Sequence, residues 1–123
     1  MNVRHVISAL FVVALISACA TSIDVSKIDD AKYQPVSPSQ VEVITAQRNV
    51  TRPYKEIAIL DAEEGGGESY GDMIKQLRER AGAMGAHAII VTPSSTSRGG
   101  VFIGNNYVQG KYKTIHATAI RWN

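Results

Sequence analysis

The lone cysteine of the chain, Cys19, follows two small residues, Ser17 and Ala18, with Ile16 at the third position before it. One cysteine cannot form an intramolecular disulfide, and a zinc site needs three or four ligands. The chemistry that its position favours is attachment of lipid to the thiol at the end of a secretory signal. The residues before it must then have the character of such a signal.

The segment before the cysteine has that character. Arg4 and His5 form a short positive region, and residues 6–16 are an apolar run of 11 residues. A membrane-spanning helix needs about 20 apolar residues, so this run indicates a signal peptide that is removed. An ordinary signal peptide that happens to contain a cysteine remains the alternative.

The motif Ile16-Ser17-Ala18-Cys19 resembles the lipobox of bacterial lipoproteins. The resemblance implies that residues 1–18 are removed and that Cys19 is acylated, palmitate being a typical chain. More than one acyl chain is needed for stable anchoring. In bacterial lipoproteins, an aspartate directly after the cysteine commonly marks retention in the inner membrane. This chain has Ala20 at that position, so the resemblance implies an outer-membrane lipoprotein whose domain faces the periplasm. The inner membrane and exposure at the cell surface stay open.

Removal of residues 1–18 leaves 105 residues with 12 Lys and Arg against 11 Asp and Glu. This length suits one small domain and a linker. The near-neutral charge gives no basis for nucleic-acid binding. We expect a single domain without disulfides.

An acidic, glycine-rich loop, residues 63–68, precedes the predicted helix, and two further acids flank it. Its glycine triplet fits neither nucleotide-binding spacing, and its acids would repel a phosphate. No EF-hand spacing is present, although calcium needs six to eight oxygen ligands. A solvated loop is therefore the preferred interpretation. The residues concerned are Gly65, Gly66, Gly67 and the acids Asp61, Glu63, Glu64, Glu68 and Asp72.

His87 and His116 are weak candidates for metal ligands, since each lies in a predicted strand and the two could approach if those strands are neighbours. The default is a hydrogen-bonded imidazole, and no metal or other cofactor is predicted. Ser94, Ser95 or Ser97 could be drawn with His116 and an acid as a triad, but no nucleophile-elbow motif supports it. We therefore predict no catalytic residues.

Residues 19–40 are predicted to be the lipidated cysteine and a flexible tether, because they contain prolines, serines and aspartates with only scattered apolar residues. At about 3.3 Å per residue, the tether could span roughly 70 Å. The alternative is that Ile23 to Ile28 packs loosely on the domain. The folded domain is expected at 41–123.

Apolar periodicity predicts the elements of this domain. Ser69 is the expected N-cap of the helix, and Gly85 suits the position that ends it. A strand, a helix and a strand in succession favour a crossover with the two strands parallel. The fold class is α+β, with a four-stranded, mixed sheet in the order β-β-α-β-β and one helix on a face. The predicted elements are strands at 41–45, 55–62, 86–92 and 111–122, the helix at 70–84 and a hairpin at 101–108.

Phe102 and Tyr107 are candidate partner contacts, because they flank the Gly104-Asn105-Asn106 tip of the predicted hairpin. Aromatic residues exposed together commonly mark interaction sites.

Three segments resemble the RcsF family of outer-membrane stress-sensor lipoproteins and the YbjQ-like family of small domains: residues 52–60, 81–91 and 115–120. The sharpest shared element is the junction Met84-Gly85-Ala86-His87-Ala88. The resemblance covers roughly residues 41–121 and implies the fold more than the function, which would be to bind or monitor envelope partners without the disulfide-dependent sensing of RcsF. RcsF domains carry two disulfides, which this chain cannot form, and no site residues follow from either family.

The sequence therefore predicts a non-enzymatic lipoprotein that binds or monitors partners in the cell envelope. A small-ligand or metal-binding periplasmic module is the alternative, and an enzyme is the third hypothesis, with no nucleophile–base set visible.

Overall fold

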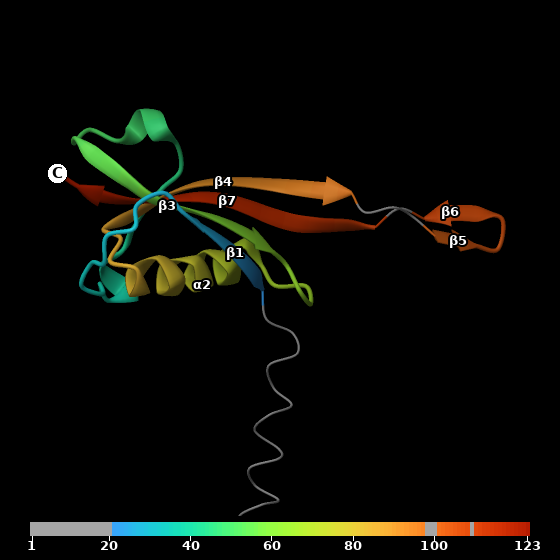
Figure 1. The fold of residues 1–123 in the computed structure, drawn as a ribbon. Helices are drawn as coiled ribbons and strands as arrows, with labels where there is room; N and C mark the ends of the chain where they lie inside the picture. Colours follow the sequence, from blue (N-terminus) through green and yellow to red (C-terminus); the bar gives the residue numbers. More distant parts are fainter. Residues whose placement is uncertain (1–20, 98–100, 109) are drawn as a thin grey trace, which may run out of the picture.

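A computed structural model describes residues 21–97, 101–108 and 110–123 (Figure 1). The predicted signal peptide and Cys19 lie outside these residues. Within them, no helix is long and apolar enough to cross a membrane.

The fold is α+β, with one helix on a mixed sheet, as predicted, but the main sheet has five strands and not four. Its order is β1-β3-β7-β4-β2, and a separate hairpin is formed by β5 and β6. The elements are β1 (Ser22–Lys27), β2 (Glu42–Ile44), β3 (Tyr54–Glu63), α2 (Tyr70–Ala83), β4 (Ala88–Ser97), β5 (Val101–Ile103), β6 (Asn106–Val108) and β7 (Lys111–Trp122), with short 3-10 helices η2 (Pro38–Gln40) and η3 (Gln47–Asn49).

The additional strand, β1, corrects the prediction of a flexible tether. It pairs antiparallel with β3, from Ser22 opposite Glu63 to Lys27 opposite Ala58. Ile23 and Val25 alternate with polar residues and pack against the main core, which is the pattern of a strand with one buried face. The alternative prediction, that Ile23 to Ile28 packs loosely on the domain, agrees better with the structure. These residues do more than pack loosely, however, because residues 22–27 form a hydrogen-bonded edge strand.

The helix follows the predicted signals closely. The Ser69 hydroxyl accepts a hydrogen bond from the Asp72 N–H at 3.1 Å, and Gly85 follows the helix with a φ of 86°.

Met73 and Leu77 are fully buried and belong to the same core cluster as Ile115 and Ala119. Small alanines on β7 let the helix approach the sheet closely.

The strands β3 and β4, on either side of the helix in sequence, run in the same direction, as predicted. They are not neighbours, because β7 lies between them and is antiparallel to both. Ile115, Ala117 and Ala119 of β7 face the helix. The alternate residues His116 and Thr118 therefore lie on the opposite face.

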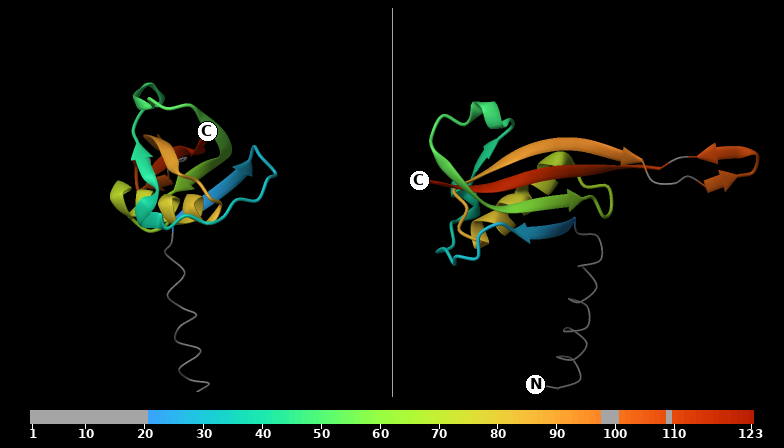
Figure 2. Two further views of the ribbon diagram at one scale, coloured as in Figure 1. Left: turned by 90° about the vertical axis from the view of Figure 1, so that its left-hand side faces the viewer. Right: turned by 45° about the horizontal axis from the view of Figure 1, so that its top comes forward.

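The opposite face of the sheet carries only a small second cluster, formed around Ile44, Ala88, Ile90 and Ile120 at one end. Farther along, Asp24, Asp61, His116 and Thr92 follow one another across four strands. Within the described residues no α-helix covers this face, and the short helix η3 lies on this side of the sheet at one end (Figure 2).

A register shift in β3 between Glu56 and Ala58 places Ile57 and Ala58 together on the helix side, where both are buried. The carbonyl oxygen of Ile57 accepts hydrogen bonds from the N–H groups of both Ile28 and Asp29, at 3.0 and 3.2 Å. The chain therefore leaves the sheet beside this irregularity. We call residues 28–36, which then cross toward the end of α2, the strap.

The strap is fixed at its far end. The Val36 N–H donates to the Gly82 carbonyl oxygen at 2.8 Å. The Tyr33 ring lies under the Arg121 guanidinium, 4.2 Å from its carbon to the ring centroid. This part of the predicted tether is thus integral to the domain.

The strand β4 extends beyond the predicted range of 86–92 and contains Pro93. Its pairing with β7 continues to Ser97 opposite Lys111, whereas β2 pairs only with residues 88–90. Proline lacks an N–H and is tolerated where a strand has an unpaired edge. The outer parts of β4 and β7 form a two-stranded extension that carries β5 and β6 at its tip (Figure 1). We call it the arm.

Candidate functional site

The tip of the arm is the predicted hairpin. Phe102 pairs with Tyr107, and Ile103 pairs with Asn106. Gly104 has a φ of 64° in the turn between them, a value that glycine adopts without strain. The two predicted contact residues, Phe102 and Tyr107, are thus brought together, with ring centroids 5.2 Å apart in an edge-to-face arrangement.

The tip concentrates exposed apolar surface. Among the described residues, six large hydrophobic side chains are exposed, and four of them lie here: Phe102 at 74%, Ile103 at 64%, Tyr107 at 56% and Val108 at 46%. The sequence from 101 to 108 contains no charged residue. Strand alternation puts Phe102 and Tyr107 on one face of the hairpin and Ile103 and Val108 on the other. Both faces are therefore available for contact.

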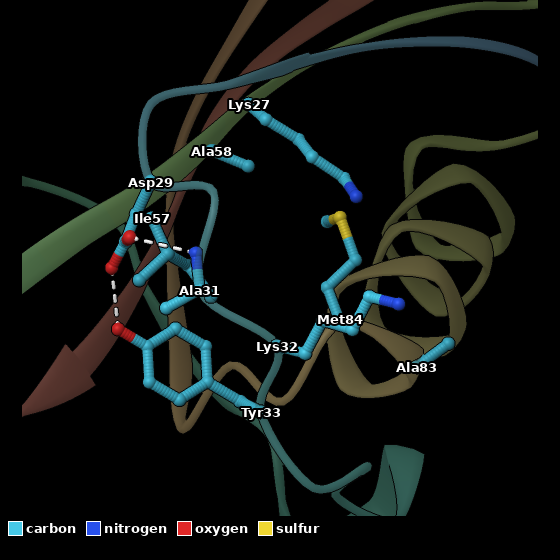
Figure 3. A pocket seen from close by; sticks show the side chains of 9 residues that line it. All are labelled: Lys27, Asp29, Ala31, Lys32, Tyr33, Ile57, Ala58, Ala83 and Met84. Atoms are coloured by element: carbon cyan, nitrogen blue, oxygen red, sulfur yellow. Dashed lines mark hydrogen bonds between the residues drawn. The ribbon is translucent and has the colours of Figure 1, made fainter.

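A second candidate site is a pocket of about 310 Å³ between the strap and the end of α2 (Figure 3). The buried residues Ile57 and Ala58 form its floor. Two lysines extend toward Met84. The sequence did not reveal this pocket, although a lone tyrosine in an otherwise polar segment was a signal for packing. Its lining comprises Lys27, Asp29, Ala31, Lys32, Tyr33, Ile57, Ala58, Ala83 and Met84.

The carboxylate of Asp29 is bound within the protein. It accepts hydrogen bonds from the Lys55 ammonium at 2.6 Å, from the Tyr33 hydroxyl and from the Ala31 N–H at 2.9 Å. The hydrogen bond from Lys55, followed by those from Tyr33 and Ala31, holds the pKa of Asp29 well below its ordinary value. The pKa of Lys55 is raised, chiefly by the same pair. Asp29 therefore fixes the strap.

The two histidines do not come together. His87 Nδ1 accepts a hydrogen bond from the Trp122 N–H at 3.0 Å, while His116 is hydrogen-bonded through Nδ1 to the Asp61 carboxylate. Trp122 and His116 are six residues apart on β7, which is about 20 Å along a strand. In the described part of the chain, no three His, Cys, Asp or Glu residues are grouped so as to hold a metal.

The predicted serine candidates are not arranged around His116. The Ser94 hydroxyl is hydrogen-bonded to Thr114 at 2.6 Å, and Ser95 is exposed. The side chain of Ser97 lies outside the described residues. His116 and Asp61 form a base–orienter pair, but no described serine is hydrogen-bonded to this imidazole.

The acidic loop is more organised than a solvated loop. Glu68 Oε2 accepts hydrogen bonds from the N–H groups of Gly65 and Gly66 at 3.0 and 2.9 Å. These bonds, above all the one from Gly66, lower the pKa of Glu68. Glu64 binds the backbone N–H of Lys113 at 2.9 Å and pairs with its ammonium at 3.3 Å. Two of the acids thus stabilise the loop itself.

Comparison with known proteins yields a likeness of fold. No family model matches the sequence, and no curated protein matches it. The structure is similar to the crystal structure of a Francisella virulence factor, FvfA, with a TM-score of 0.56 and 16% sequence identity over 81% of this chain and 97% of that one. At this identity the likeness supports the fold alone.

Proposed function

We propose that this protein is a membrane-anchored, non-enzymatic lipoprotein that binds a protein partner in the cell envelope through the tip of the arm. The observation that carries the proposal is the uncharged hairpin with four exposed apolar side chains. Contiguous exposed apolar surface is uncommon on soluble proteins and marks interaction sites. Aromatic residues supply much of the binding energy at such sites.

The location is proposed from the sequence. Acylation at Cys19 would hold the domain at the outer membrane, facing the periplasm, and the resemblance to the RcsF family suggests that the partner reports on the state of the envelope. The described residues contain no hydrogen-bonded nucleophile beside His116, and we propose no reaction.

Site-specific crosslinking in living cells tests this proposal. A photoreactive residue in place of Phe102 or Tyr107 should trap an envelope protein, whereas the same residue in place of Glu79, exposed on α2, should not. In parallel, Cys19→Ala should abolish incorporation of labelled palmitate into the protein. Equal crosslinking at all three positions, or none at the tip while Glu79 traps a partner, would contradict the role of the arm.

A further inference from the structure

We infer that the pocket beside the strap binds a small amphipathic anion, with an acidic head group at the two lysines and a short apolar tail on the buried floor. This site is distinct from the arm, and its ligand is independent of the proposed protein partner. The argument depends on the shape of the pocket, on its charge and on its preformed walls.

The floor of the pocket is apolar because of the irregularity in β3. Ile57 and Ala58 both point to the helix side, and β1 ends opposite Ala58. The sheet therefore leaves a gap there, which the strap spans rather than fills. Ala83 and Met84 close the other side. A volume of about 310 Å³ is at the lower end of the range for small-molecule sites, roughly 300–1,000 Å³.

The charge at the mouth of the pocket is positive. Lys27 and Lys32 are exposed and have no ion-pair partner among the described residues. The one carboxylate in the lining, Asp29, is already bound by Lys55 and Tyr33. Two ammonium groups thus remain for an anion, with which they would form charge-assisted hydrogen bonds.

The end of α2 does not cancel this preference. A helix C-terminus carries partial negative charge, but two of the carbonyl groups at this end are occupied: Ala81 accepts from Met84 and Ala86, and Gly82 accepts from Gly85 and Val36. The two lysines extend toward this end and offset its dipole (Figure 3). A neutral or cationic ligand would gain nothing from them.

The walls of the pocket are held in place without a ligand. The strap is tied to β3 through Asp29 and Lys55 and to the helix end through Val36 and Gly82. The Tyr33 ring is covered by Arg121. A preformed pocket loses less entropy on binding than a flexible one, which favours a ligand site over an incidental gap.

Calorimetry with defined probes tests the inference. The mature chain from residue 19 with Cys19→Ala, purified without detergent, is titrated with octanoate, octyl phosphate, inorganic phosphate and neutral octanol. We expect saturable binding of octanoate and octyl phosphate and weak or no binding of inorganic phosphate and octanol. Lys27→Ala with Lys32→Ala should weaken binding of the two anionic amphiphiles at least tenfold, and Lys75→Ala, an exposed lysine on α2, should not.

A site-specific signal completes the experiment. The Met84 methyl resonance should shift on saturation with octanoate, and Ala83→Leu should abolish binding by filling the pocket. Absence of saturable binding, equal affinity for octanol, or undiminished affinity in the double lysine variant would overturn the inference. Binding of inorganic phosphate as tight as that of octyl phosphate would overturn the role of the apolar floor.

Discussion

His87 links the start of β4 to the end of β7 through a single nitrogen atom. Its Nδ1 accepts the Trp122 N–H and must therefore be unprotonated. Burial, then the charges of Arg121 and Arg52, lower the pKa of this imidazole below its ordinary value. In the unfolded chain the pKa returns to about 6.5, so the unfolded state binds more protons at mildly acidic pH. Stability should therefore rise with pH through this window.

The prediction at this residue is a loss of stability on acidification from about pH 7.5 to pH 5, near and below the unfolded pKa. His87→Asn should remove that part of the pH dependence, because the amide oxygen can accept the Trp122 N–H and does not titrate. Thermal unfolding of both proteins across this pH range measures how their stability depends on pH. His116→Asn, at an exposed position, is the control and should retain the slope. An unchanged slope in His87→Asn would show that another group is responsible.

At the scale of elements, the contact between the strap and α2 depends on the absence of a side chain at Gly82. A Cβ there would collide with the Val36 carbonyl oxygen and lie 3.2 Å from Val41 Cγ2. Val36 also donates its N–H to the Gly82 carbonyl. The backbones of the two elements are thus in direct contact.

We predict that Gly82→Ala destabilises the protein by about 1–3 kcal/mol, the usual cost of overpacking, despite the higher helix propensity of alanine. Gly71→Ala in the first turn of the same helix is the matched control. The nearest atom to its Cβ is Ser69 Oγ at 3.7 Å, so it should be neutral or stabilising by up to about 1 kcal/mol. Chemical denaturation compares the free energies of unfolding of the two variants. Equal values would mean that the strap is not packed against the helix in solution.

The elements also show what periodicity could reveal. The helix from Tyr70 was predictable because cap, apolar stripe and terminal glycine agree, and β7 because its alternation extends over 12 residues. The strand β1 was missed because only Ile23 and Val25 mark its buried face. The pocket was missed because it forms between segments far apart in sequence. The hairpin tip, in contrast, is local, and Phe102 and Tyr107 could be predicted to lie together from the turn alone.

At the scale of the whole molecule, the tip of the arm and the core are separate. Among the side chains that the structure describes, none from β5 or β6 belongs to the core cluster, and the four exposed side chains of the tip do not contribute to it. We predict that Phe102→Ser with Tyr107→Ser changes the free energy of unfolding by less than about 0.5 kcal/mol, as expected for surface positions. Leu77→Ala in the core should cost about 2–5 kcal/mol. A large loss in the double variant would assign the tip a structural role.

The early start of β1 has a consequence for the anchored protein. Thr21 is already buried and accepts a hydrogen bond from Gln76 at 3.1 Å, so if Cys19 is acylated, only Ala20 separates the lipidated residue from the fold. At about 3.3 Å per residue, the domain would rest against the bilayer. It could not tumble freely or sample positions far from the membrane surface. Encounters would be confined to the plane of the membrane. The anchor would then set which way the arm points as well as where the protein resides.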